Sequence, residues 1–204
     1  MRTTGWIAAI FLSVIVACAH DGDVAGGGSG EATMEEAREF IAWYGAQRAR
    51  LDKDAALAYW KAANSGRKAD FEAYAAADLA LKTFHSDGEV YRKIQSLLKA
   101  PDDLGDIEIR SLKVAELAYK ENQLPPDVLK RLVDKSSEIE QVFNTFRATM
   151  DGKQYTNNDL LEILSSSTDT AKRKTAWEAL KQVGSKVAPM LVDLAVIRNE
   201  AART

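Results

Sequence analysis

Few side chains in this sequence are of the kinds that hold a catalytic metal or attack a substrate. The 204 residues include two histidines, His20 and His85, which lie far apart in unrelated contexts, and a single cysteine. A zinc site normally takes three or four ligands from histidine, cysteine and carboxylate side chains. The sequence has no HExxH, no Cys/His cluster, no GxSxG and no glycine-rich phosphate loop. We therefore expect no catalytic residue, no metal ligand and no cofactor within these 204 residues.

Charge excludes one class of partner and explains one acidic cluster. The formal net charge is −3 and the pI is near 5.5, whereas nucleic-acid-binding domains concentrate Lys and Arg against phosphates. We expect no nucleic-acid partner.

Glu35, Glu36 and Glu39 lie where a helix should begin, and carboxylates in a first turn stabilise the helix dipole. That structural role is a sufficient reason for the cluster.

The N-terminus has the layout of an export signal. Arg2 precedes an apolar run over residues 5–17, and Cys18 follows at once. The run is shorter than the roughly 20 residues that a permanent membrane helix needs. Residues 15–18 resemble the bacterial lipobox, in which the cysteine receives a diacylglyceryl group and becomes the first residue of the mature protein. We expect lipidation of Cys18; the alternative is an ordinary signal peptide cleaved at an A-x-A-like site around Cys18.

Three segments follow from this interpretation. Residues 1–17 form the lipoprotein signal peptide, residues 18–32 a flexible Gly/Ser tether, and residues 33–204 an all-helical body. The tether would hold the body at the periplasmic side of a bacterial membrane through the lipid on Cys18. Because alanine rather than an acid follows Cys18, the sorting pattern resembles that of lipoproteins sent to the outer membrane.

The body has helical periodicity throughout and no strand-like alternation. A capping box at Thr33 and Glu36 predicts the first helix start, and Leu129 to Met150 give the clearest seam, with apolar residues at alternating steps of three and four. The sequence therefore predicts an all-α, elongated multi-helix array. The expected helices cover about 33–63, 68–84, 90–98, 107–119, 126–150, 157–164 and 170–204.

The conspicuous side chains in these helices have structural explanations. Trp43, Trp60 and Trp177 lie on apolar stripes, so we expect them to pack in the core rather than to stack on a ligand. His85 ends a helix, where a cation is favourable near the C-terminal dipole. Neither kind of residue predicts chemistry.

The last helix ends without a closing signal. It runs to Thr204 with no Gly or Asn C-cap and no proline after it. A helix that ends in this way can simply fray, and the expectation that the chain is a natural or annotated fragment of a longer protein rests on a family resemblance as well.

Three stretches of the sequence resemble a known family. Trp177 and Glu178, followed by the segment Arg198 to Arg203, look like the N-terminal part of the angiotensin-converting-enzyme family of zinc peptidyl-dipeptidases, and Trp60 with Asn64 resembles that family's Ala-x-Trp-x-x-x-Asn stretch. The resemblance covers about residues 34–203. The family-motif positions, to which we assign a structural role, are Trp60, Asn64, Trp177, Glu178, Arg198, Asn199, Glu200 and Arg203.

The resemblance implies a fold and an activity that these residues cannot complete alone. In the family the matching helices form a lid and one wall of a deep cleft, and an HExxH helix with a later Glu binds the zinc. Both zinc-binding elements are absent here. Some relatives bind chloride through an Arg after a second Trp, where this chain has Leu180 and Lys181.

The sequence supports two hypotheses about function, which belong to different classes. In the first, the chain is the N-terminal part of a zinc-dependent peptidyl-dipeptidase, inactive alone, with weak peptide binding and a missing C-terminal catalytic half as its partner. The alternative is a non-catalytic helical periplasmic lipoprotein that serves as an interaction or scaffolding module. Exposed apolar surface on the isolated body would favour the first.

Overall fold

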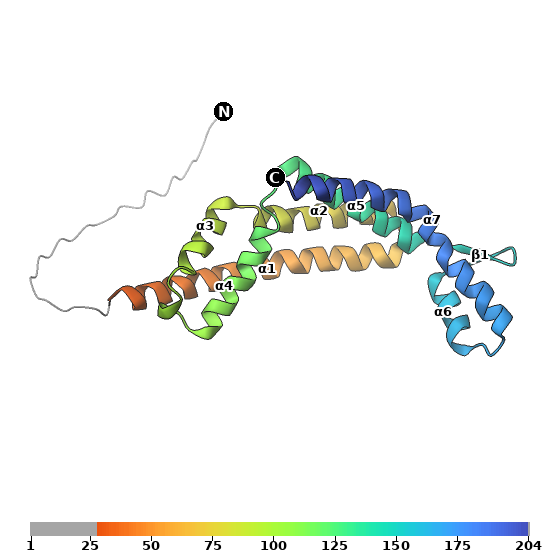
Figure 1. Ribbon diagram of the computed structural model, residues 1–204, viewed down its shortest axis with the longest axis horizontal. Coiled ribbons are helices and arrows are strands. Elements are labelled where there is room, and N and C mark those ends of the chain that lie inside the picture. The colour runs from red at the N-terminus through yellow and green to blue at the C-terminus, as the bar shows by residue number, and fades with distance from the viewer. Residues whose placement is uncertain (1–27, 204) are drawn as a thin grey trace, which may run out of the picture.

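The chain folds as an elongated array of helices. The computed structural model describes residues 28–203, with side chains from residue 33, and within that range the fold is all-α apart from one short hairpin. This confirms the predicted fold class. The helices lie in a long central stack with a smaller lobe at each end (Figure 1). The elements are α1 (Gly28–Ser65), α2 (Lys68–His85), α3 (Gly88–Leu97), the 3-10 turn η1 (Pro101–Asp103), α4 (Asp106–Lys120), α5 (Pro126–Thr145), β1 (Ala148–Met150), β2 (Lys153–Tyr155), α6 (Asn157–Ser166) and α7 (Thr170–Ala201).

Helices α1 and α2 form an antiparallel hairpin that runs through the centre of the molecule (Figure 1). Gly66 makes the turn with φ +66, a left-handed conformation that glycine adopts without a steric penalty. The predicted helix start at Thr33 is wrong, because α1 begins at Gly28 and Thr33 lies inside it. The helix therefore includes the last residues of the segment expected as a tether. The predicted signal peptide, Cys18 and the rest of that tether lie outside the described residues.

The first lobe packs α3, η1 and α4 against the N-terminal half of α1. Asp87 caps α3 by accepting a hydrogen bond from the Glu89 amide at 2.8 Å. At the lobe's edge, Arg38 donates to Glu108 at 2.9 Å and ties α1 to α4. The core consists of Ala37, Phe40, Tyr44, Ile94, Leu97, Leu104, Leu112, Ala115 and Tyr119.

Helix α5 packs against α2 and also against α7. It begins at Pro126, which suits a first helical position because its missing N–H would have no partner there. The buried Ser137 hydroxyl donates to the carbonyl of Phe71 at 3.1 Å and joins α5 to α2. The predicted seam is too long: α5 ends at Thr145, and Met150 belongs to a strand. Because α5 packs on two sides, its buried residues are more widely spread than one seam allows.

The second lobe contains the hairpin, α6 and the first half of α7. Asp151 and Gly152 form the tight turn between β1 and β2, with φ 52 and φ 76. A type I′ turn requires such positive φ values at both central residues. Thr156 and Asp159 form a capping box at α6, and Asp169 caps α7. The small core consists of Ala148, Met150, Leu160, Ala176 and Ala179. Sequence periodicity missed the strands because three residues each are too short to show alternation.

Helix α7 joins the two parts of the molecule. Its first half belongs to the second lobe and its second half packs on α5, with Pro189 inside the helix. Over residues 28–203, no helix combines the length and apolar character that crossing a bilayer requires.

Candidate functional site

The expected core tryptophans are largely on the surface. Trp177 is 53% exposed and Trp60 70%, so the prediction that they pack in the core is wrong for these two. Trp43 is 42% exposed, and its ring packs against those of Phe40 and Phe84 at the edge of the first lobe's core. Apolar stripes on α1 and α7 are wider than the faces that neighbouring helices cover. Near these tryptophans the covered positions are small residues, namely Ala62 on α1 and Ala176 and Ala179 on α7.

Trp177 and Glu178 lie on α7 in the second lobe. The ammonium of Lys181 sits 5.4 Å from the centre of the Trp177 ring, within the range of a cation–π contact. Glu178 pairs with Lys174 one turn earlier at 3.8 Å. These contacts are between residues of a single helix at the surface, and none of them closes a pocket.

The other end of α7 carries the segment Arg198 to Arg203. Glu200 accepts two hydrogen bonds from Arg131 of α5, at 3.0 and 2.9 Å, in the two-pronged geometry that suits a guanidinium and a carboxylate. Arg198 lines a hollow of about 290 Å³ between α2, α5 and α7. Asn199 and Arg203 are exposed. This segment therefore fixes α7 against α5 and leaves polar groups facing solvent.

Trp60 and Asn64 lie in the last turns of α1. The side-chain amide nitrogen of Asn64 donates to the backbone carbonyl of Trp60, one turn earlier on the same helix, at 2.7 Å. Trp60 extends into solvent.

The structure does not gather the predicted motif positions into one constellation. Trp177 and Arg198 are 21 residues apart on one helix, which corresponds to about 32 Å. Trp60 and Asn64 lie on a different helix, α1. Of these positions, Glu200 contacts a neighbouring helix through Arg131, whereas the side chain of Asn64 bonds within its own helix.

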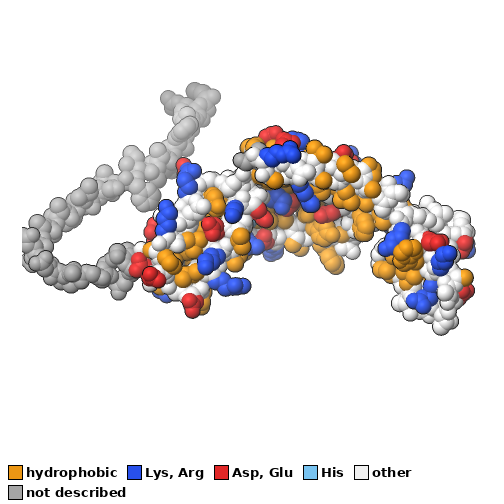
Figure 2. Space-filling view, viewed as in Figure 1, with side chains coloured by type: hydrophobic (Ala, Val, Ile, Leu, Met, Phe, Trp, Pro, Cys, Tyr) orange, Lys and Arg blue, Asp and Glu red, His pale blue; other side chains and the backbone are white. Residues whose placement is uncertain are grey.

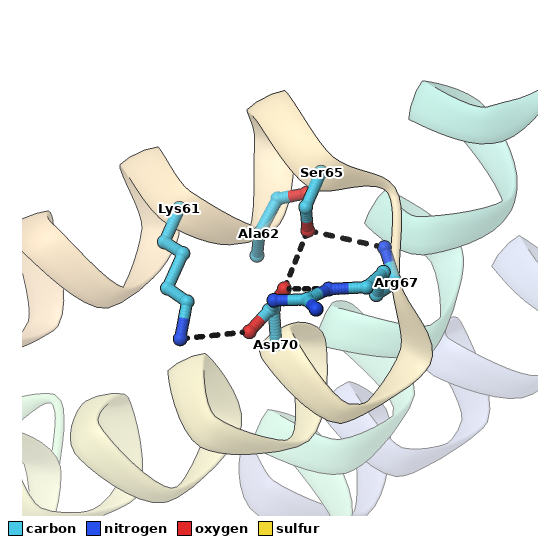
Figure 3. Close-up of polar contacts among 5 residues, drawn as sticks. All are labelled: Lys61, Ala62, Ser65, Arg67 and Asp70. Atoms are coloured by element: carbon cyan, nitrogen blue, oxygen red, sulfur yellow. Dashed lines mark hydrogen bonds and ion pairs between the residues drawn. The ribbon is translucent and has the colours of Figure 1, made fainter.

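A polar cluster that sequence reasoning missed locks the turn between α1 and α2 (Figure 3). The carboxylate of Asp70 is 5% exposed, accepts a hydrogen bond from Ser65 at 2.6 Å and one from Arg67 at 2.8 Å, and pairs with Lys61 at 3.1 Å. These partners, with the Ser65 hydroxyl first, lower the pKa of Asp70 well below its usual range. Only the Arg67 to Asp70 spacing is readable in the sequence, because Lys61 comes from the preceding helix.

A second missed cluster surrounds His85. The Nε2 atom of His85 lies 3.1 Å from the hydroxyl of Tyr44, and the rings of Phe84 and Tyr119 pack around it. Burial, with a smaller contribution from Arg48, lowers the pKa of His85. The expectation that a charged His85 serves the helix dipole is wrong, since the buried ring is favoured in its neutral form. Burial also raises the pKa of Tyr119, whose hydroxyl has no hydrogen-bond partner in the described part of the chain.

The described residues do not fit a zinc ion. Between residues 28 and 203, no three His, Cys, Asp or Glu side chains gather in a way that could hold a metal. His85 is also engaged with Tyr44 inside the ring cluster.

What the chain does offer is apolar surface. Along α7, Val192 is 64% exposed and Val196 61%, and on α1 Leu57 is 57% exposed beside Trp60. Hydrophobic side chains also show on the surface over α5 and α7 and over the α6 lobe (Figure 2). Monomeric proteins seldom leave contiguous apolar surface uncovered, so these faces are suited to packing against another protein surface.

Comparison with known proteins identifies one family. The family described as angiotensin-converting enzyme, Peptidase_M2, matches residues 31–204 of this chain. No curated protein matches the sequence. The match covers most of the helical body and confirms the resemblance to this family.

Proposed function

The chain belongs to the angiotensin-converting-enzyme family of peptidases, and from that membership we propose that its helices supply the lid and one wall of the peptide cleft in a zinc-dependent peptidyl-dipeptidase. The observation that carries the proposal is the extent of the family match, which covers residues 31–204. The activity is the removal of dipeptides from the C-terminus of peptides, as the resemblance implies.

The exposed apolar faces support a role as part of a larger folded unit. Trp60 on α1 and Trp177 with Val196 on α7 are each more than half exposed. Fully burying a large apolar side chain is worth about 1.5–3 kcal/mol, so covering several of them would strongly stabilise an assembly. In this proposal the catalytic half packs there.

The chemistry itself lies elsewhere in this proposal. The 204 residues contain no HExxH, and the described ones do not fit zinc. We propose that these residues bind and orient peptide but do not hydrolyse it alone. Peptide binding without the catalytic half is weak, because only one wall of the cleft is present.

The same proposal places the protein at a membrane surface. The lipobox-like residues before Cys18 support lipidation of its thiol, cleavage of residues 1–17 and attachment to the periplasmic side of a bacterial membrane, with the outer membrane favoured by Ala19. Replacing Cys18 with alanine should move the protein from the membrane to the soluble fraction and abolish labelling by a tagged fatty acid. Unchanged membrane attachment would contradict lipidation.

The activity is tested with and without the region encoded after Thr204. The chain alone, supplied with zinc, should release no dipeptide from a blocked tripeptide, whereas co-expression with the adjoining coding region should give release that a chelator abolishes. Val196→Asp should reduce that release by weakening the packing of α7, and Lys186→Asp, an exposed position on the same helix, serves as the control.

One result would favour the non-catalytic interaction module instead. If the adjoining region encodes no HExxH, and the mature lipoprotein from membranes has the mass of this chain without its signal peptide, the peptidase proposal fails. The groove described next would then be the first place to look for a partner.

A further inference from the structure

A groove of about 380 Å³ runs between α1 and α4 in the first lobe. Its walls are Ile41 on α1 and Ile107 with Val114 on α4, and its floor includes Gly45. Two guanidinium groups, those of Arg48 and Arg110, flank it. None of the residues that line the groove is among the exposed positions that the proposed function uses, which are Trp60 on α1 and Trp177 and Val196 on α7.

The spacing of the groove residues is that of a helix-packing seam. On α4 the exposed apolar residues Ile107, Val114 and Leu117, at 79%, 44% and 65% exposure, follow steps of seven and three. On α1, Ile41, Gly45 and Arg48 follow steps of four and three. Residues at these steps share one helix face. The two helices therefore each place such residues at the groove, α4 through Ile107 and Val114 and α1 through Ile41 and Gly45.

Gly45 allows a close approach to this seam. A Cβ placed on Gly45 meets no atom within 4 Å, so the position is open. Glycine within a helix costs about 0.5–1 kcal/mol relative to alanine, and a second helix backbone can approach closest where there is no side chain.

The two arginines at the groove favour an acidic partner. Arg110 makes no hydrogen bond or ion pair with any residue of the described chain, and it stands beside the exposed Ile107 and Val114. Arg48 pairs with Asp52 at 3.0 Å and lies over the Tyr44 ring, which leaves part of its guanidinium facing the groove. A partner bearing carboxylates beside its apolar face complements both cations.

We propose that the groove between α1 and α4 binds an acidic amphipathic helix of another polypeptide. Apolar side chains spaced by three and four residues would pack between Ile41, Ile107 and Val114, and carboxylates beside them would pair with Arg110 and Arg48. Helix-in-groove binding of this kind uses an apolar stripe for affinity and flanking charge for selectivity.

The test uses designed peptides as probes. The acidic probe is a fluorescent helix of about 18 residues, or five turns, with Leu along one stripe, Glu beside it and Ala elsewhere. A basic probe has Lys in place of Glu, and a third has Ser in place of Leu. Titration of the full chain, followed by anisotropy, should show saturable binding of the acidic probe and at least tenfold weaker binding of the other two.

Variants of the chain locate the binding. Gly45→Leu fills the groove from its open floor and should weaken binding at least tenfold, while Gly184→Leu, on α7 and equally free of neighbours, should leave it unchanged. Arg110→Glu should shift the preference toward the basic probe, and Lys113→Glu, at a position that lines a different hollow, should not. Circular dichroism confirms that each variant folds.

Three results would overturn the proposal. Equal binding of the acidic and basic probes would remove the charge argument, and unchanged binding to Gly45→Leu would remove the groove. Concentration-dependent dimers that Gly45→Leu abolishes would show that a second copy of this chain occupies the groove. None of these measurements depends on peptidase activity, so the proposed function stands or fails separately.

Discussion

The hydroxyl of Tyr44 lies 3.1 Å from Nε2 of His85, joining α1 to the end of α2 inside a cluster of rings. Burial lowers the pKa of His85 from its ordinary value of 6.5. Arg48 acts in the same direction, whereas Asp52 and Glu121 oppose it. The stability of this junction therefore depends on pH.

We expect acid to destabilise the protein through His85. Because the folded state lowers this pKa, the unfolded chain binds the proton more readily, so the contribution is present above pH 6.5 and is lost as pH falls toward the folded value. Urea unfolding should show the free energy of unfolding falling between about pH 7 and about pH 5. His85→Gln should fall less steeply over this range. A variant that falls as steeply as the wild type would contradict the assignment.

Asp70→Asn should loosen the turn between α1 and α2. The amide cannot replace the charge that pairs with Lys61 and Arg67, so the midpoint of thermal unfolding should drop by roughly 2–4 °C at pH 7. The lowered pKa of Asp70 means that its contribution is present above pH 3.8 and is lost as pH falls below that value. The two proteins should therefore converge in strong acid. Asp54→Asn, an exposed position on α1, is the control.

Glu140→Gln should increase the stability of the folded protein at neutral pH. One carboxylate oxygen of Glu140 is buried without a hydrogen-bond partner in the described chain, and burial, with Asp78 nearby, raises its pKa above 4.5. For an acid with a raised pKa, the stabilising contribution is present below pH 4.5 and is lost as pH rises through the folded value. The stability of the variant relative to the wild type should therefore increase from pH 4 to about pH 7. Chemical unfolding at both pH values measures it, with the exposed Glu162→Gln as control.

Leu112→Ala tests the first lobe's core. Leu112 is fully buried, so its truncation should lower the free energy of unfolding by about 2–5 kcal/mol. Leu117→Ala on the same helix, at a position 65% exposed, should change it by no more than about 0.5 kcal/mol. Similar losses in both variants would show that something covers Leu117 in solution.

Two glycines should respond to alanine in opposite directions. Gly66→Ala places a side chain at φ +66, with its Cβ only 3.1 Å from the Thr145 side chain, and should destabilise by about 1–2 kcal/mol. Gly45→Ala, in the open middle of α1, should stabilise by about 0.5–1 kcal/mol. Denaturant midpoints of the two variants on either side of the wild type would confirm both.

The sequence predicts local order better than it predicts which faces are covered. Caps and turn residues such as Asp169 and Gly152 act within a few residues, so helix positions in the body follow from the sequence. The burial of Trp60 depends on whether another surface meets α1, which no local pattern records. His85 shows the same limit, since its partner Tyr44 is 41 residues away. Family motifs indicated ancestry, but their residues are too dispersed to form a site.

Helix α7 has a continuous backbone, but the stability of its two halves has different sources. Its first half is stabilised by the small core of the second lobe and its second half by α5, so the two halves are protected by different packing. Pro189 lies between them and leaves the carbonyl of Ser185 without its usual helical donor. Amide hydrogens before this proline should exchange with solvent together with those of α6, and amides after it together with those of α5. One helix in geometry thus belongs to two cooperative folding units.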